Sequence, residues 1–316
     1  MTKPSIQELG EGRQMIDLGF RDTEGLVASY VIPEEEGSTV IETGPTSCRD
    51  LLLRGLELAG VERASVRKVF VTHIHLDHAG GVGALMHDLP SAEFYAHHLG
   101  TPHLIDPTRL ISSARRVWGA AADPLWGPIV PVPANRIHSL MGGERFPVSG
   151  GTLEVLNTPG HAKHHLAFFD TPTGAILTGD GAGVRLEGAG RPRPALPPPD
   201  LDLEELYRSV DAMKAKNPRA VWYSHFGPAP NGGEDLAIYP RICEEWRAVA
   251  WKAAQESPDP QYVGRRLREF EESHVAADDS DRVVEDREDL VSGYEMAAMG
   301  LLRYFATKDK TGRGTG

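Results

Sequence analysis

The most constraining feature of the sequence is VTHIHLDHAGG, residues 71–81, which follows an apolar, β-branched run typical of a buried strand. Side chains two residues apart at the end of an extended segment point to the same side, so His73 and His75 can hold one metal ion together. Asp77 and His78 lie past the following turn and can offer ligands to a second position. Imidazole and carboxylate at this density, without thiolate, suit zinc, iron or manganese.

Three further ligand candidates each follow a strand-like run. His161 comes after a Pro-Gly turn in TLEVLNTPGH, Asp180 ends GAILTGD, and His225 follows AVWYS. Loops at strand ends converge at one edge of a β-sandwich, so we expect these residues to join the first four. The predicted metal site therefore comprises His73, His75, Asp77, His78, His161, Asp180 and His225.

The chain divides by pattern into two parts and a tail. Residues 1–230 alternate strand-like and helical runs, whereas residues 231–307 have helical apolar spacing throughout. We predict a catalytic domain, a helical extension packed on it, and a disordered tail over residues 308–316. The helices of the extension are expected at Leu236–Gln255, Val263–Ser273 and Glu285–Thr307.

Residues 101–135 combine a helical run, TRLISSARRVWG, with a Pro- and Trp-bearing stretch that has no clear period. A long irregular segment inside a compact domain is often a binding loop, so a lid over the site is one interpretation of this region. Trp118 and Trp126 would then form an apolar wall, although Trp also packs ordinary loops. The sequence leaves both interpretations open.

Charge and apolar patterning argue against several classes of function. The formal net charge of −12 disfavours a nucleic-acid surface, which needs a clustered basic footprint. No apolar run approaches the ~18 residues that span a bilayer. The N-terminus lacks the apolar core of a signal peptide, so we expect no membrane partner and a cytoplasmic location. Cys48 and Cys243 are expected to be ordinary buried thiols.

The order HxHxDH, an isolated His, an Asp and a final His resembles the metallo-β-lactamase superfamily over roughly residues 15–230. Within it, the chain resembles an uncharacterised group that shares a GHAxHH segment and an SHFGP ending. The resemblance implies an α/β fold, the αβ/βα four-layer sandwich, here with a C-terminal helical extension. It implies two divalent metal ions, zinc first and iron or manganese as alternatives. One ion would bind His73, His75 and His161, the other Asp77, His78 and His225, with Asp180 bridging.

One position departs from the family pattern. An Asp-Thr-Gly turn commonly follows the third strand, and this chain has Glu42, Thr43 and Gly44 instead. The family's carboxylate supports the metal-binding loop through hydrogen bonds, and a glutamate can do the same from one methylene further away. We therefore expect Glu42 to support the site without binding metal.

Two divalent ions, two aspartates and a bridging hydroxide leave a charge of about +1, which stabilises an oxyanion. Because metal-bound water ionises near neutral pH, we predict a hydrolase whose metal-bridging hydroxide attacks a carbonyl of a small molecule. The predicted catalytic residues are Asp77, Asp180 and His165. His165 matches the second His of GHTPGH in N-acyl-homoserine lactonases, but their Tyr three residues after the bridging Asp is Gly183 here. A lactone or other carboxylic ester is the first substrate prediction.

Several alternatives remain. A thioesterase of glyoxalase II type shares the pattern up to TPGH, although its basic glutathione-binding domain is not evident. A persulfide dioxygenase would hold one iron ion, and Asp77, His78 and His225 would then lie around the iron site without binding the metal. A non-catalytic metal-binding protein is disfavoured by the complete ligand set. The C-terminal helices could form a homodimer or cover the sandwich, and Lys163 could contact a substrate carboxylate or lie exposed.

Overall fold

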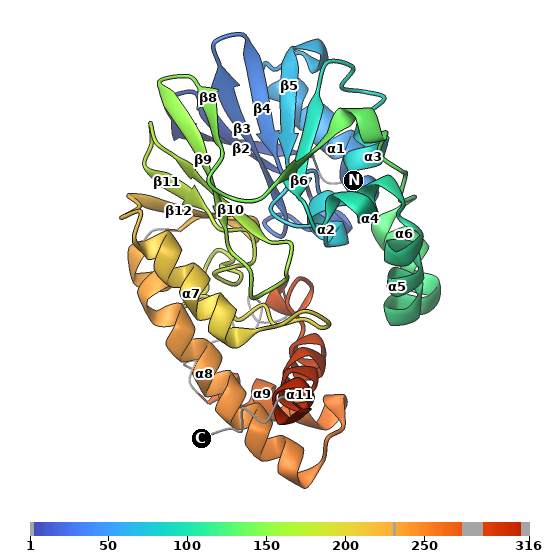
Figure 1. Ribbon diagram of the computed structural model, residues 1–316, viewed down its shortest axis with the longest axis vertical. Helices are drawn as coiled ribbons and strands as arrows, with labels where there is room; N and C mark the ends of the chain where they lie inside the picture. Colours follow the sequence, from blue (N-terminus) through green and yellow to red (C-terminus); the bar gives the residue numbers. More distant parts are fainter. Residues whose placement is uncertain (1–2, 230–231, 274–286, 311–316) are drawn as a thin grey trace.

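The computed structural model describes residues 3–229, 232–273 and 287–310. Two β-sheets stack face to face with helices on their outer sides, and further helices extend from one end of this sandwich (Figure 1). The architecture is the predicted αβ/βα four-layer sandwich with C-terminal helices.

The first sheet has its seven strands in chain order. Its strands are β1 (Ser5–Gly10), β2 (Arg13–Asp17), β3 (Ala28–Glu34), β4 (Gly37–Ile41), β5 (Val66–Phe70), β6 (Glu93–His97) and β7 (Ile137–Leu140). The strands from β1 to β4 are antiparallel, and those from β4 to β7 are parallel. Parallel strands need crossover connections, which contain α1 (Arg49–Leu58), α2 (Leu76–Ala79) and α3 (Val82–Leu85). The sequence analysis predicted neither β1 nor β7.

The second sheet has six strands in the order β13-β12-β11-β10-β9-β8. They are β8 (Arg145–Val148), β9 (Gly151–Asn157), β10 (Leu166–Asp170), β11 (Ala175–Leu177), β12 (Ala220–Tyr223) and β13 (Gly227–Ala229). Only β11 and β12 pair in parallel, across a connection that contains α7 (Leu203–Lys214). Asp202 caps α7 by accepting a hydrogen bond from the Glu205 backbone N–H at 3.0 Å.

Large aromatic side chains fill the space between the two sheets. Phe70 of the first sheet packs edge-on against Phe168 of the second, with ring centroids 5.5 Å apart. Tyr30 and Trp222 stack across the same interface at 5.7 Å. Such close-packed, buried contacts hold the strand ends at fixed positions, and the loops that follow those ends carry the candidate site.

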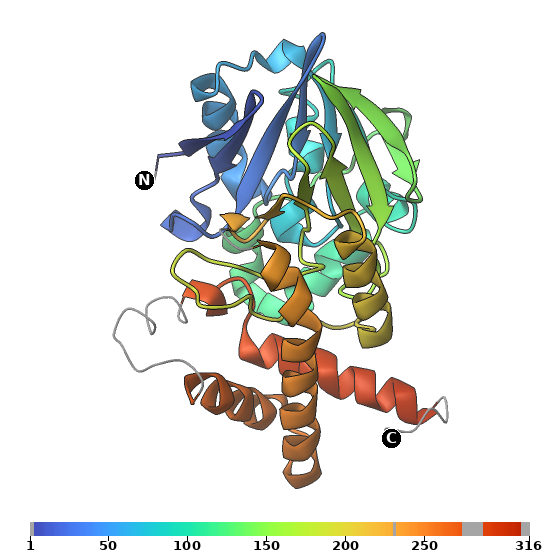
Figure 2. The same cartoon turned by 90° about the vertical axis from the view of Figure 1, so that its left-hand side faces the viewer.

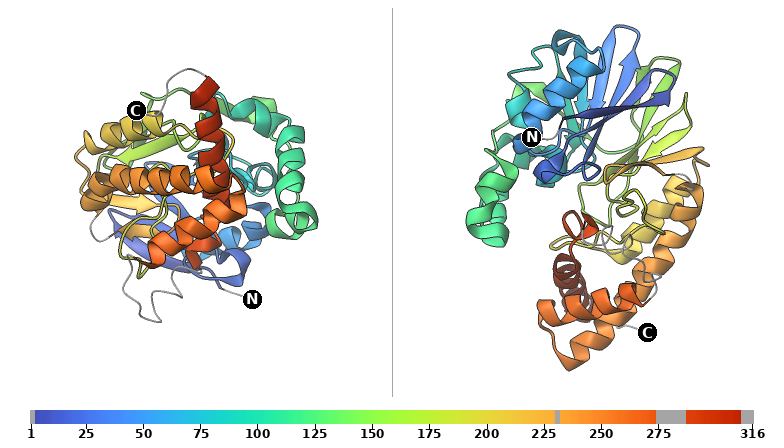
Figure 3. Two further views of the ribbon diagram at one scale, coloured as in Figure 1. Left: turned by 90° about the horizontal axis from the view of Figure 1, so that it is seen from below. Right: turned by 180° about the vertical axis from the view of Figure 1, so that it is seen from behind.

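The segment 101–135 is more regular than predicted. It forms α4 (Thr101–Ile105), α5 (Thr108–Trp118) and α6 (Ala122–Trp126) before an extended stretch that leads to β7. The predicted helix at TRLISSARRVWG is confirmed. Figure 3 shows α4–α6 and the C-terminal helices descending from the same end of the sandwich on different sides.

The C-terminal extension consists of α8 (Gly232–Glu256), α9 (Pro260–Glu272) and α11 (Tyr294–Lys310), which cross one another below the sandwich (Figure 2). The predicted helix Glu285–Thr307 is interrupted in its described part, because a turn over residues 290–293 precedes α11; residues 285–286 lie outside the described part. The backbone N–H of Tyr294, where α11 begins, donates to Asp289 at 3.2 Å. The predicted tail begins too early, since α11 continues through Lys310; residues 311–316 lie outside the described part. Within the described residues, no helix is long and apolar enough to cross a bilayer.

Candidate metal centre

The structure brings all seven predicted ligands together at the end of the sandwich from which the helices extend. His73 and His75 lie in the loop after β5, and α2 carries Asp77 and His78. The remaining three come from the second sheet: the loops after β9, β11 and β12 carry His161, Asp180 and His225. The side chains form two groups, and within each group the potential ligand atoms lie within 4.8 Å of one another.

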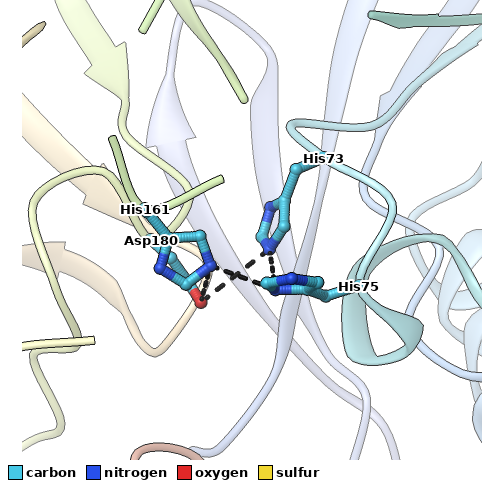
Figure 4. Close-up of side chains that lie close together, drawn as sticks. All are labelled: His73, His75, His161 and Asp180. Carbon is cyan, nitrogen blue, oxygen red and sulfur yellow. Dashed lines mark hydrogen bonds and ion pairs between the residues drawn. The ribbon is translucent and has the colours of Figure 1, made fainter. Parts of the chain in front are cut away.

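The first group consists of His73, His75, His161 and Asp180 (Figure 4). The Nδ1 atom of His75 lies 2.9 Å from Nε2 of His73 and 3.0 Å from Nε2 of His161. The Oδ2 atom of Asp180 lies 3.5 Å from Nε2 of His161 and 4.0 Å from Nε2 of His73. Three ring nitrogens and one carboxylate oxygen therefore point at a common centre.

The outer hydrogen bonds of these rings determine which nitrogens carry lone pairs. Nδ1 of His161 donates to the carbonyl oxygen of Ala195 at 2.9 Å, so its Nε2 has no hydrogen when the ring is neutral. Nδ1 of His73 donates to the Thr72 hydroxyl at 3.0 Å, because that hydroxyl gives its own hydrogen to Glu42. Two lone pairs therefore face Nδ1 of His75, which can satisfy at most one of them with a hydrogen. A cation at the centre would satisfy all three.

The second group consists of Asp77, His78 and His225. The Nε2 atoms of His78 and His225 face each other at 3.2 Å, and Oδ2 of Asp77 lies 3.5 Å from that of His225. Both Nδ1 atoms point away: that of His225 donates to the Leu26 carbonyl at 2.6 Å, and that of His78 to Glu42 at 3.0 Å. The two Nε2 atoms are therefore oriented inward, as metal-binding imidazoles require.

Asp180 spans the two groups. While Oδ2 faces the first group, Oδ1 lies 3.4 Å from Nε2 of His78 and 3.6 Å from Nε2 of His225. Oδ1 is buried and accepts no hydrogen bond from any residue in the part of the chain that the structure describes. A buried carboxylate oxygen without a donor is costly, and a bound cation would compensate it. The donor set therefore fits a divalent metal.

The imidazoles of the first group are held neutral. Burial lowers the pKa of His73 and His75 well below the ordinary value of 6.5, and neighbouring imidazoles lower it further. Burial also lowers the pKa of His161, despite the opposing effect of Asp180. A neutral imidazole is the form that binds metal, so this group needs no deprotonation at neutral pH.

The second group favours a positive charge instead. Burial alone would lower the pKa of His78, but the carboxylates of Asp180 and Glu42 outweigh it and raise the pKa well above its ordinary value. The pKa of His225 is raised in the same way against its burial, by Asp180 and Asp77. Conversely, both imidazoles lower the pKa of Asp180 against the effect of its own burial. The carboxylates of this group therefore stabilise a cation.

Glu42 occupies the supporting position predicted for it. Its Oε1 accepts hydrogen bonds from the Thr72 hydroxyl at 2.6 Å, the Ser224 hydroxyl at 2.9 Å and Nδ1 of His78 at 3.0 Å. Its Oε2 accepts the Thr72 backbone N–H at 3.3 Å. The carboxylate thus connects the loops after β5 and β12 and fixes the ring of His78.

The sequence analysis missed Thr72 and Ser224. Each hydroxyl residue directly precedes a ligand, His73 or His225, and adjacent side chains in an extended segment point to opposite sides. The hydroxyls therefore turn away from the centre towards Glu42 while the imidazoles turn inward. The dipeptides Thr-His and Ser-His at the two strand ends were the available signal.

His165 lies behind the ligands instead of among them. Its ring is fully buried, Nδ1 is bonded to the Thr158 hydroxyl at 2.8 Å, and Nε2 accepts the Asp180 backbone N–H at 3.2 Å. Gly179 leaves room for this ring, since a Cβ there would lie 2.7 Å from Nε2. The predicted direct catalytic role does not fit this position, because both ring nitrogens are already engaged. His165 positions the loop that carries Asp180.

Other sequence predictions have mixed outcomes. Lys163 forms an ion pair with Asp200 at 3.0 Å and is 69% exposed, which agrees with an exposed loop lysine. Trp126 is buried and stacks on Phe20 with centroids 5.7 Å apart, and Trp118 packs edge-on against it. The apolar wall over the site stays a prediction. The free cysteines, Cys48 and Cys243, are both buried as expected.

Comparisons with known proteins agree with the fold. The family model of the metallo-beta-lactamase superfamily matches residues 22–225, which is more than half of the chain. The protein ST1585 of Sulfurisphaera tokodaii, described as metallo-beta-lactamase fold-containing, is 25% identical over 180 residues, 56% of this chain and 63% of its own length. A hydroxyacylglutathione hydrolase of Aeromonas hydrophila is 29% identical over 125 residues, 38% of this chain and 37% of its own. The chain thus spans less than two thirds of either relative.

Solved structures share the architecture over nearly the whole chain. A beta-lactamase domain protein from Burkholderia ambifaria has a TM-score of 0.67 at 17% identity, covering 98% of this chain and 90% of its own. The crystal structure of ST1585 has a TM-score of 0.63 at 20% identity, covering 92% and 98%. Together with the family match and the seven converging side chains, these findings show that the chain belongs to the metallo-beta-lactamase superfamily.

Proposed function

We propose that this protein is a metal-dependent hydrolase that holds two divalent ions and cleaves a carboxylic ester, lactones included. The observation that carries the proposal is the position of Asp180. Its two carboxylate oxygens face different groups of ligands, Oδ2 the first and Oδ1 the second. One side chain that serves two adjacent positions is what a two-metal site requires.

The donor set favours zinc. Five imidazoles and two carboxylates without a thiolate suit zinc, with iron or manganese as alternatives. The first group would be formed by three histidines and Asp180, the second by two histidines, Asp77 and Asp180. In the second group both imidazoles have their Nδ1 hydrogen fixed by an acceptor, the Leu26 carbonyl or Glu42.

When bound, such a pair of ions supplies Lewis acidity and ionises a water near neutral pH. The chain's own residues supply the geometry. Asp180 fixes the distance between the two groups, and its position is fixed by the hydrogen bond from its backbone N–H to His165. His75 and Asp77 are the partly exposed members of the two groups, whereas the other five side chains are buried. Substrate would therefore approach from the side of His75 and Asp77.

The surroundings of Gly183 bear on the substrate class. A Cβ at this position would lie 2.3 Å from the Arg193 carbonyl oxygen and 2.6 Å from the ring of Tyr239. The Tyr that N-acyl-homoserine lactonases carry here therefore has no space in this chain. This favours a carboxylic ester other than an N-acyl-homoserine lactone.

A thioester is the second candidate substrate. The similarity to a hydroxyacylglutathione hydrolase supports it, because an acylglutathione is a thioester. A mononuclear-iron dioxygenase has less support, since the complete group of Asp77, His78 and His225 would then serve no metal.

The test pairs metal content with hydrolysis. Purified wild-type chain loaded with zinc is assayed against p-nitrophenyl esters, lactones and acyl thioesters, beside Asp180→Ala and the control Asp123→Ala, whose side chain is 77% exposed. We expect Asp180→Ala to lose metal and hydrolysis together, and Asp123→Ala to retain both. Hydrolysis at the wild-type rate by Asp180→Ala that has lost its metal would refute the proposal. Turnover of the thioesters alone would select the second candidate.

A further inference from the structure

The connection between the Asp180 loop and α7 includes the proline segment, residues 193–199, with the sequence RPALPPP. Prolines have no backbone N–H, so the segment cannot pair as an ordinary strand and its carbonyls need donors from elsewhere. One of these carbonyls, that of Ala195, accepts Nδ1 of His161 at 2.9 Å. The segment therefore contains the acceptor that orients one of the candidate ligands.

The C-terminal extension holds the acceptor residue, Ala195, and the residue before it. The Ser292 hydroxyl donates to the carbonyl of Pro194 at 2.8 Å, in a buried contact. The hydroxyl of Tyr239, on α8, lies 3.4 Å from the backbone N of Ala195. Neighbouring residues of the segment are thus held by different parts of the extension.

The closest approach is between α11 and Leu196. A Cβ on Gly300 would lie 1.9 Å from the Leu196 carbonyl oxygen, against 3.4 Å or more in ordinary contact. Gly300 therefore lets the backbone of α11 lie directly against the proline segment. Further along, Arg303 of the same helix donates to the carbonyl of Pro199 at 3.0 Å.

Arg193 fixes the other end of the segment. Its guanidinium lies 3.9 Å from the ring centre of Tyr294 and forms an ion pair with Asp289 at 2.9 Å. Its backbone pairs with Val184 through hydrogen bonds of 3.0 and 2.9 Å, and Val184 is four residues after Asp180. The segment is therefore fixed between the candidate metal centre and the extension.

We infer that the C-terminal helices position His161 for metal binding by clamping the proline segment around Ala195. The extension then belongs to the metal centre functionally, although none of the seven ligands comes from it. This inference rests on the proposed function, because it takes His161 as a ligand. It predicts that a change on α11, outside the ligand set, selectively weakens the first metal group.

The decisive variants are Gly300→Ala and Ser292→Ala. The new methyl of Gly300→Ala forces a displacement of at least about 1.5 Å, the difference between 1.9 Å and an ordinary contact of 3.4 Å. Because loss of an outer hydrogen bond to a ligand costs roughly 10- to 100-fold in metal affinity, we expect a loss of that size for one of two zinc equivalents. Ser292→Ala removes a single hydrogen bond and should weaken the same equivalent roughly threefold.

Gly233→Ala is the matched control. It is the same substitution in the same extension, at the start of α8, where a new Cβ would meet no other atom within 4 Å. His161→Ala serves as the reference for loss of the first group. Zinc affinity is measured by competition with a chromophoric chelator, and cobalt absorption identifies which equivalent is lost. Circular dichroism checks folding.

The inference is supported if Gly300→Ala and Ser292→Ala weaken the equivalent that His161→Ala loses, while Gly233→Ala binds both equivalents as wild type does. If Gly300→Ala does not fold, Ser292→Ala decides alone. Wild-type affinity for both equivalents in the Gly300→Ala and Ser292→Ala variants would overturn the inference, and so would equal weakening in Gly233→Ala. A wild-type chain that binds no metal would instead overturn the proposed function.

Discussion

Replacing Glu42 by Gln removes one negative charge and almost no volume, and the structure indicates what this costs. Oε1 of Glu42 accepts three hydrogen bonds, and Oε2 accepts the Thr72 backbone N–H at 3.3 Å. A glutamine can place its oxygen at the Oε1 position and keep three acceptor contacts. Its NH₂ group then faces the Thr72 N–H, so one acceptor becomes a donor facing another donor.

Hydrogen bonds to charged groups contribute about 1.5–3 kcal/mol and neutral ones about 0.5–1.5 kcal/mol. Glu42→Gln weakens three such bonds and loses a fourth, but it also removes the cost of burying a carboxylate. We expect the free energy of unfolding to fall by about 1–3 kcal/mol. The basicity of His78 also falls, because its Nδ1 no longer donates to a carboxylate, and zinc affinity of the second group should drop roughly 10- to 100-fold.

Urea unfolding of the metal-free chain measures the first quantity, and zinc competition with a chromophoric chelator measures the second. Glu57→Gln is the control, since that side chain is 58% exposed and pairs with Arg63 instead of a residue of the site. If Glu42→Gln unfolds at the wild-type urea concentration and binds both zinc equivalents with wild-type affinity, then Glu42 does not fix the ring of His78. The stability and zinc affinity of Glu42→Asp should lie between those of wild type and Glu42→Gln, since aspartate keeps the negative charge but its carboxylate reaches one methylene less far.

Two further predictions concern buried groups. His165→Phe keeps most of the ring volume but leaves the Asp180 backbone N–H without its acceptor. The free energy of unfolding, measured by heat and by urea, should therefore fall by about 1–3 kcal/mol. Unchanged stability would mean that the ring nitrogens of His165 do no positioning. Burial raises the pKa of Cys48 to about 12 and also raises that of Cys243, so few thiolates form at pH 8. Ellman's reagent should find no reactive thiol in the native chain and two after unfolding in guanidinium; rapid native labelling would contradict this.

The convergence of the seven candidate ligands was predictable because each segment that carries them follows a strand-like run. VRKVF before the first motif and GAILTG before Asp180 contain β-branched residues and end abruptly, and the structure has β5 and β11 there. Strand ends on the two sheets meet at one edge of a sandwich, so position in the sequence was enough to predict proximity. The support from Glu42 was predictable only through the family resemblance.

The outer contacts of the ligands were not predictable in the same way. The partner of His161 is the Ala195 carbonyl, 34 residues further along the chain and in a segment without secondary structure. Backbone carbonyls leave no trace in sequence, and the segment's position depends on contacts with α8 and α11. The catalytic role predicted for His165 was wrong because its ring turns towards the Thr158 hydroxyl, whereas the ring of His161, four residues earlier, turns inward.

The prediction of secondary structure from sequence was wrong where the local pattern was weak. The run IHSL of β7 has exposed residues at its two central positions, so it carries little apolar signal. It becomes a strand because it pairs in parallel with β6 at the edge of the first sheet. Similarly, α5 was predicted from its spacing, but α6 contains only five residues and includes a proline.

The most direct test of the central claim is the number of metal ions per chain, measured by elemental analysis of protein purified without added metal or chelator. Seven converging ligands with Asp180 between two groups predict close to two divalent ions per wild-type chain, with zinc first among them. A chain with no metal, and with no uptake of zinc on titration, would contradict the account. A single iron ion that zinc neither displaces nor joins would also contradict it, and would favour the dioxygenase alternative.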